Sequence, residues 1–174
     1  MKISGRPRKR PKIDVPKDMV IIQDTREQKP LFSPAPYIID KNLKTGDYSI
    51  AGMEEMVTIE RKTIGDLYGT LGRGRDRFEK ELRRMSPMLW KGLLIEGTED
   101  DMMRGLDLSV IDNPKKKNVM TPNKIYHSLS SLEVQGLHVY YARGKKSARE
   151  WVLSRLTRFY KHFRGGKLWD AQKK

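Results

Sequence analysis

The sequence has no cysteine, only three histidines and no long hydrophobic segment. The lack of cysteine excludes disulfide bonds and thiolate metal sites and fits a reducing compartment. The longest apolar runs, Met19–Ile22 and Leu93–Ile95, are too short to cross a bilayer, and the N-terminus lacks the apolar segment of a signal peptide. We therefore expect an intracellular protein, in the cytoplasm, the nucleoid or the nucleus, with no membrane partner.

Acidic residues are the minority of the charged residues. The 174 residues include 36 Lys and Arg against 22 Asp and Glu, which gives a net charge of +14. Such an excess favours binding to a polyanion, and nucleic acid is the commonest one. A soluble protein that is merely basic is the alternative that charge alone leaves open. A chain of this length most simply forms one domain with a sizeable core.

The basic residues are concentrated at the N-terminus. Met1–Lys12 carries six basic residues, no acid and almost nothing apolar, so we expect residues 1–17 to form a disordered arm that contacts DNA. Its Gly-Arg-Pro sequence resembles part of an AT-hook, and a generic phosphate-binding arm is the alternative. Residues 18–163 would form the folded domain, followed by a basic tail at 164–174. The arm residues expected to bind DNA are Arg6, Arg8, Lys9 and Arg10.

Between the arm and the tail, the sequence predicts alternating strands and helices, that is, an α/β fold. Apolar runs indicate strands at Met19–Gln23, Tyr37–Asp40, Gly46–Ile50, Met56–Arg61, Gly92–Gly97 and Leu137–Ala142, the third and fourth of which form a hairpin. Helices are expected after the N-cap Thr63, after Gly74 to about Trp90, from Thr98 to Leu106, from Pro122 to Gly136, and from Ser147 to Phe163. The second helix should bury Phe78, Leu82, Met85 and Leu89.

The strand that precedes Thr63 carries the candidate chemistry. Side chains alternate along a strand, so Glu60 and Lys62 share one face while Arg61 points to the other. Asp47 begins the neighbouring strand, thirteen positions before Glu60. Two carboxylates suit Mg²⁺, or Mn²⁺, which takes oxygen ligands, waters and substrate phosphate. Lys62 would orient or deprotonate the attacking water, or neutralise charge in the transition state of phosphodiester cleavage; a plain ion pair is the alternative.

Two further acids have a local explanation beside the functional one. Asp24 follows a strand and could lie at the metal site, but it could equally pair with its neighbour Arg26. Asp66 stands three residues after Thr63, as in a capping box, so it would either cap the helix or support the site. A basic run in the loop at 108–120, well placed to touch a phosphate backbone although most simply solvated, comprises Lys115, Lys116 and Lys117.

The ordered set Gly46-Asp47, Glu60-Arg61-Lys62 and Asp66 resembles the signature of the XPF-type structure-specific endonucleases. The similarity covers roughly Val20 to Leu156. It implies a restriction-endonuclease-like α/β fold, with a mixed central sheet flanked by helices, and dependence on Mg²⁺ or Mn²⁺. By this resemblance the catalytic residues are Asp47, Glu60, Lys62 and Asp24. Asp47 and Glu60 bind the metal with Asp24 beside them as a further metal residue, and Arg61 and Asp66 support the site. The remaining expected DNA contacts are Arg26, Arg73 and Arg75.

The resemblance implies a nuclease that cuts branched, flapped or forked DNA in repair, recombination or the processing of mobile-element or phage DNA. The helix-hairpin-helix module that binds junctions and dimerises in relatives does not follow in this sequence. We therefore expect a homodimer or assistance from a partner, and a phage or mobile-element origin is plausible on this architecture. The rival interpretations are a catalytically silent DNA-binding scaffold and a basic RNA-binding protein.

Overall fold

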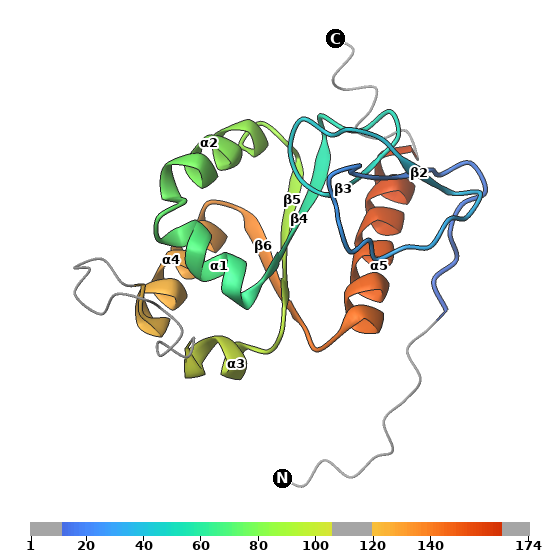
Figure 1. Ribbon diagram of the computed structural model, residues 1–174. Coiled ribbons are helices and arrows are strands. Elements are labelled where there is room, and N and C mark those ends of the chain that lie inside the picture. The colour runs from blue at the N-terminus through green and yellow to red at the C-terminus, as the bar shows by residue number, and fades with distance from the viewer. Residues whose placement is uncertain (1–11, 106–119, 165–174) are drawn as a thin grey trace, which may run out of the picture.

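A mixed β-sheet with helices on both faces forms the frame of the protein (Figure 1). The structure is a computed structural model that describes residues 12–105 and 120–164. In these ranges the strands are β1 (Ile21–Gln23), β2 (Ile38–Asp40), β3 (Tyr48–Ile50), β4 (Val57–Thr63), β5 (Trp90–Glu96) and β6 (Leu137–Ala142). The helices are α1 (Ile64–Leu71), α2 (Arg75–Met85), α3 (Glu99–Arg104), α4 (Pro122–Val134) and α5 (Lys145–Arg164). The predicted α/β fold with a mixed sheet is confirmed.

The strand order in the sheet is β2-β1-β3-β4-β5-β6. The predicted hairpin is present, because β3 and β4 pair antiparallel with Tyr48 opposite Ile59. β4, β5 and β6 then run parallel to one another, and β4 places Glu60 beside Leu93 of β5. β4 therefore has a neighbour on each side, so the strand that carries Glu60 and Lys62 lies inside the sheet.

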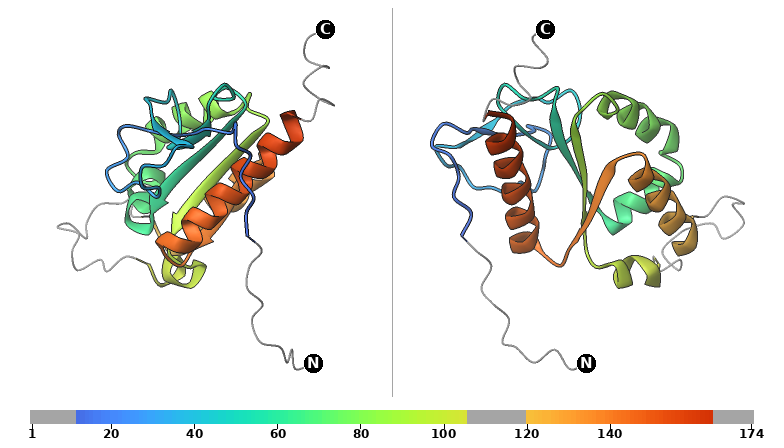
Figure 2. Two further views of the ribbon diagram at one scale, coloured as in Figure 1. Left: turned by 90° about the vertical axis from the view of Figure 1, so that its right-hand side faces the viewer. Right: turned by 180° about the vertical axis from the view of Figure 1, so that it is seen from behind.

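Each face of the sheet has its own hydrophobic core. Helix α5 covers one face, and α1 to α4 lie on the other (Figure 2). The alternation of side chains divides β5 between the two cores: Leu94 packs on the α5 side, whereas Leu93 and Ile95 pack on the side of α1 to α4. Glu60 and Lys62 lie beside Leu93 and Ile95 in register, so they face α1 and α2.

Side-chain caps begin several helices as the sequence predicts. The hydroxyl of Thr63 accepts a hydrogen bond from the Asp66 N–H, and Thr98 and Asp101 form a full capping box before α3. Helix α5 differs, because it begins at Lys145, two residues before the expected Ser147. The Ser147 hydroxyl lies within the first turn and exchanges hydrogen bonds with the backbone of Gly144.

Helix α2 is shorter than the sequence pattern predicts. It ends at Met85 and not near Trp90, which is the first residue of β5. Pro87 explains the early end, since proline has no backbone N–H to continue the helical hydrogen bonds. Leu89 consequently lies outside the helix and is 48 % exposed, so its predicted place on the buried face is wrong.

The described structure extends a few residues into the segment assigned to the N-terminal arm. Val15 packs against the α5-side core, and Asp14 forms a 3.1 Å ion pair with Lys161 of α5. The expected DNA contacts Arg6, Arg8, Lys9, Arg10, Lys115, Lys116 and Lys117 lie outside the described residues. Of the helices that the structure describes, none combines the length and the apolar character needed to span a membrane.

Candidate active site

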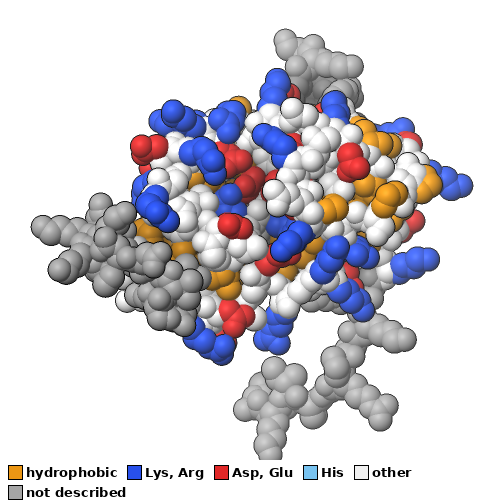
Figure 3. Space-filling model, viewed as in Figure 1, with side chains coloured by type: hydrophobic (Ala, Val, Ile, Leu, Met, Phe, Trp, Pro, Cys, Tyr) orange, Lys and Arg blue, Asp and Glu red, His pale blue; other side chains and the backbone are white. Residues whose placement is uncertain are grey.

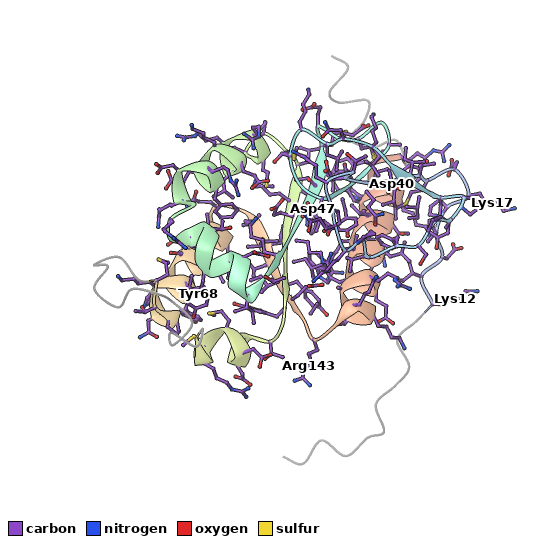
Figure 4. All side chains as sticks on the ribbon, in the orientation of Figure 1. Lys12, Lys17, Asp40, Asp47, Tyr68 and Arg143 are labelled. Atoms are coloured by element: carbon purple, nitrogen blue, oxygen red, sulfur yellow. The ribbon has the colours of Figure 1, made fainter. Side chains whose placement is uncertain are left out.

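Asp47 lies immediately before β3 and is held there by β4, the strand beside it. Its backbone N–H donates to the carbonyl of Ile59 at 2.8 Å, and its Oδ2 accepts the N–H of Arg61 at 2.7 Å. The partners in these two bonds, Ile59 and Arg61, are the residues on either side of Glu60 in the sequence. Figure 4 shows Asp47 close to the middle of the sheet. Gly46 permits this approach, since it has a φ of +76° and a Cβ at its position would overlap the Thr58 hydroxyl.

Glu60 and Lys62 form a buried ion pair on the face of β4 that the alternation predicts. The Lys62 Nζ donates to Glu60 Oε1, and the two side chains are 12 % and 10 % exposed. The same ammonium lies 5.4 Å from the ring centroid of Phe78 on α2. The ion pair anticipated as the plain structural alternative is therefore present, in the immediate neighbourhood of a second carboxylate.

Both carboxylate oxygens of Asp24 accept hydrogen bonds from other groups of the protein. Its Oδ1 accepts from the backbone and the Nε of Arg26, both at 2.8 Å, while Oδ2 accepts from Arg26 Nη2 and from the Leu43 N–H. Burial would raise the pKa of Asp24, but the hydrogen bonds from Arg26 and Leu43 outweigh it and hold the pKa below its usual value. This is the pairing that the sequence offered as an alternative to metal binding.

Arg61 points to the opposite face of β4 and links three segments. Its guanidinium pairs with Glu27 at 3.1 Å and with Glu96 at the end of β5. It also donates to the carbonyl of Lys29 at 2.6 Å. The side chain is 8 % exposed, so Arg61 is a buried cross-link that holds β4 to β5 and to the loop after β1.

The carboxyl groups of the site are held away from water. Burial is the main cause that raises the pKa of Asp47, and the neighbouring acids Glu27 and Glu81 add to it. Burial, followed by the charge of Asp47, raises the pKa of Glu60 against the opposing effect of Lys62. For Lys62, burial lowers the pKa, but the partner Glu60 outweighs it and the pKa is raised. The negative charges of Asp47 and Glu60 thus repel each other at a site that is shielded from water.

Glu81 of α2 is close enough to this group to influence its pKa values, and the sequence analysis missed it. Its charge raises the pKa of Asp47, of Glu60 and of Lys62, which places it within electrostatic reach of all three. The signal available in the sequence was its spacing, because Glu81 is one turn after Phe78 and shares its side of the helix. Nothing in that spacing identified the strand residues it would meet.

The donor set at Asp47 and Glu60 fits a divalent cation. Mg²⁺ is commonly held by one or two carboxylates together with water and substrate phosphate, and a cation would relieve the repulsion between two buried carboxylates. Across residues 12–105 and 120–164, no three acidic or histidine side chains converge as a ready-made metal site. Two carboxylates leave the remaining coordination positions of such a cation to water and other oxygen ligands.

The remaining predicted site residues lie around the helices next to β4. Asp66 is exposed at the start of α1. Its carboxylate accepts a 2.7 Å hydrogen bond from the Thr63 hydroxyl, and its backbone N–H is the one that this hydroxyl caps. Arg73 is exposed in the turn between α1 and α2, and Arg75 pairs with Glu79 one turn further on. In Figure 3 acidic side chains are surrounded by Lys and Arg on the face that carries α1 and α2.

The family model described as the ERCC4 domain matches residues 24–154. No curated protein matches this chain. Among solved structures, the chain is similar to XPF from Aeropyrum pernix, with 21 % identity and a TM-score of 0.54 over 88 % of this chain and 72 % of that one. It is also similar to XPF from Aeropyrum pernix in complex with DNA, with 20 % identity and a TM-score of 0.56 over 82 % of this chain and 64 % of that one.

These two structures share the fold of the protein. The family match includes Asp24, Asp47, Glu60 and Lys62, and it covers well over half of the chain. The chain therefore belongs to the ERCC4 domain family, as an XPF-type nuclease domain.

Proposed function

We propose that the protein is a Mg²⁺- or Mn²⁺-dependent endonuclease that hydrolyses phosphodiester bonds in branched, flapped or forked DNA. The observation that carries this proposal is the meeting of Asp47, Glu60 and Lys62: two mutually repelling carboxylates beside a shielded ammonium. Such a cluster is unfavourable for folding and useful for binding a cation and a phosphate. The family membership and the net charge of +14 support a nucleic-acid substrate.

Asp47 and Glu60 would hold the cation, which supplies polarisation of the scissile phosphate and a bound water of lowered pKa. Lys62 remains a cation at neutral pH because its pKa is raised beside Glu60. We therefore assign it to stabilising negative charge that develops on the phosphate, and not to removing a proton from water. Lys62 lies on β4, pairs with Glu60 and packs near Phe78, and these contacts hold its ammonium in a fixed position.

The buried groups around this cluster position it. Arg61 fixes β4 against β5, and its backbone N–H holds the Asp47 carboxylate. Asp24 fixes Arg26, whose side chain is 66 % exposed next to the site and would meet DNA phosphate. We assign Asp24 to this positioning role, since a metal at Asp24 would have to replace hydrogen bonds that the protein already provides.

A catalytically silent DNA-binding scaffold is the second candidate function. The direct Glu60–Lys62 ion pair favours the scaffold, because a lysine that is paired with one acid can have a purely structural role. The two candidate functions differ in their need for the charge of Asp47. Removing that charge would abolish cleavage by a nuclease but would leave DNA binding by a scaffold intact.

The test is cleavage of labelled duplex, 3′-flap, fork and four-way-junction DNA with Mg²⁺ or Mn²⁺, by the wild type and by Asp47→Ala. We expect cutting of a branched substrate that is lost in the variant and in EDTA. Tight binding of branched DNA by both proteins, with no cutting by either, would establish the scaffold.

Lys62→Ala separates catalysis from binding in the same assay. We expect a loss of at least about 100-fold in turnover, with the dissociation constant for DNA nearly unchanged. Lys80→Ala, on the exposed side of α2, is the matched control and should cut normally. Weaker binding with normal turnover in Lys62→Ala would contradict the assigned role.

A further inference from the structure

A groove of about 330 Å³ opens beside Lys62, between the start of α1 and the start of α2. One wall is the exposed side of α1, and the other carries Arg77 of α2. Because Lys62 lines it, the groove leads directly to the proposed catalytic group. None of the described residues that line it is aromatic, so it is not built to stack bases.

Arg77 is the unengaged cation of this groove. It is exposed, and among the described residues it has neither a hydrogen bond nor an ion pair, whereas its neighbour Arg75 pairs with Glu79. Asp66, the acid on the groove's rim, is bonded to the Thr63 hydroxyl at the start of α1. A free guanidinium in the groove that Lys62 also lines has the charge and the donor geometry for a phosphate group.

The wall formed by α1 has no side chain at two positions, because both are glycine. Gly65 and Gly69 are four residues apart, lie on one side of this eight-residue helix and line the groove. Glycine inside a helix is unfavourable relative to alanine. Neither residue has the positive φ that requires glycine. A Cβ at Gly69 would meet nothing within 4 Å, and one at Gly65 would meet only the Thr63 hydroxyl at 3.8 Å.

The fold therefore gives no reason for these two glycines. The contrast with Gly46 and Gly92 is direct, since a Cβ at Gly46 would overlap the Thr58 hydroxyl and one at Gly92 would come within 2.8 Å of two tryptophan rings. At Gly65 and Gly69 the space that a side chain would occupy is the groove itself. Glycine there keeps the groove open to something that approaches the α1 backbone closely.

We propose that this groove receives the sugar–phosphate backbone of the DNA strand next to the scissile phosphate. Arg77 binds a phosphate of that strand, and Gly65 and Gly69 let the backbone approach α1. The strand is recognised by its charge and path and not by its bases, because the groove offers cations and bare backbone. This inference rests on the proposed function for the identity of the scissile site, but it concerns binding and can be tested without cleavage.

The test compares Gly69→Ala, Gly69→Leu and Arg77→Ala with the wild type. Fork-DNA binding is measured in EDTA by fluorescence anisotropy, cleavage is measured with Mg²⁺, and melting temperature is measured without DNA. Gly144→Ala, at another glycine with nothing within 4 Å, is the steric control. Arg158→Ala, an exposed arginine of α5 on the opposite face of the sheet, is the charge control.

We expect Gly69→Ala to melt about 2–4 °C higher than the wild type, because alanine favours the helix. Gly69→Leu should nevertheless weaken DNA binding about tenfold by filling the groove. Arg77→Ala should weaken binding by about 3- to 10-fold and reduce the slope of log K against log salt by about one. Both controls should bind DNA like the wild type.

The outcomes separate this inference from the proposed function. If the wild type cuts DNA while Gly69→Leu and Arg77→Ala bind and cut normally, the groove assignment is overturned and the nuclease stands. If the wild type does not cut but these variants bind more weakly than the controls, the groove stands and the nuclease proposal fails. A lower melting temperature of Gly69→Ala would show that the fold itself needs this glycine. That result would overturn the inference that Gly69 is present to keep the groove open.

Discussion

The backbone N–H of Arg61 donates a 2.7 Å hydrogen bond to Oδ2 of Asp47, so an acid immediately before β3 is held by β4. The residue that makes this bond stands between Glu60 and Lys62 in the sequence. The β3–β4 hairpin therefore places the two acids and the lysine next to one another.

Asp47→Asn should abolish cleavage and stabilise the metal-free protein above pH 6. The folded-state pKa of Asp47 is raised, so its contribution to stability is present below the unfolded pKa of about 4 and is lost as pH rises through the folded value. Asparagine keeps an oxygen for the Arg61 N–H but carries no charge. We expect a gain on the order of 1–3 kcal/mol near pH 8 and little gain near pH 4.

The measurement for Asp47→Asn is urea unfolding in EDTA at several pH values between 4 and 8. Adding Mg²⁺ should narrow the difference from the wild type at high pH, because a bound cation compensates the carboxylates. A stability difference that does not change with pH would contradict the raised pKa of Asp47.

Arg61→Ala should be strongly destabilising. The change leaves Glu27 and Glu96 without their shared partner in a poorly solvated place, which typically costs about 3–5 kcal/mol. Arg75→Ala removes an exposed ion pair with Glu79 and is the matched control, with an expected effect below about 1 kcal/mol. Urea denaturation of both variants measures the difference, and equal effects would mean that Arg61 is not a cross-link.

Gly46→Ala should disturb both stability and activity. The backbone of Gly46 has a φ of +76°, and a methyl group there overlaps the Thr58 hydroxyl. Gly52 shares the positive φ, at +80°, but has open space around it. Gly52→Ala should therefore cost about 1–2 kcal/mol for the backbone alone, and Gly46→Ala on the order of 1–3 kcal/mol more for the overlap.

Thermal unfolding of the two alanine variants isolates the steric part of this cost, and the cleavage assay tests the site. We expect Gly52→Ala to cut DNA and Gly46→Ala to fail, since the overlap displaces Asp47. Normal cutting by Gly46→Ala would show that the loop before β3 can move without moving the acid.

Deleting Met1–Lys12 should weaken DNA binding and reduce its dependence on salt. The segment carries six basic residues, and each phosphate contact that is lost reduces the slope of log K against log salt by about 0.9. We expect the slope to fall by as much as about 5. Replacing the six basic residues by serine, at unchanged length, separates charge from chain length; an unchanged slope in both variants would mean that the arm does not touch phosphate.

Much of the site was predictable because its geometry is local. Strand alternation correctly put Glu60 and Lys62 on one face, and the capping pattern correctly began α1 at Thr63. The short hairpin determines which strands neighbour each other, so the sequence alone predicts that Asp47 lies next to Glu60.

The features that the sequence analysis missed depend on contacts between distant segments. Arg61 is 35 positions from Glu96, and no local pattern indicates that they pair. Glu81 could be assigned to a side of α2, but its approach to Asp47 depends on how that helix packs on the sheet. The end of α2 is different, since Pro87 marks it in the sequence and outweighs the apolar spacing that continues up to Leu89.

The alternation of β4 has a consequence for how inactive variants can be made. Ile59 lies in the α5-side core, one residue before Glu60 on the opposite face. A deletion of one residue within β4 would exchange the two faces, placing charges in the core and apolar side chains at the site. Such a deletion would thus unfold the protein, so a well-folded variant that lacks the charges of the site has to be made by substitution.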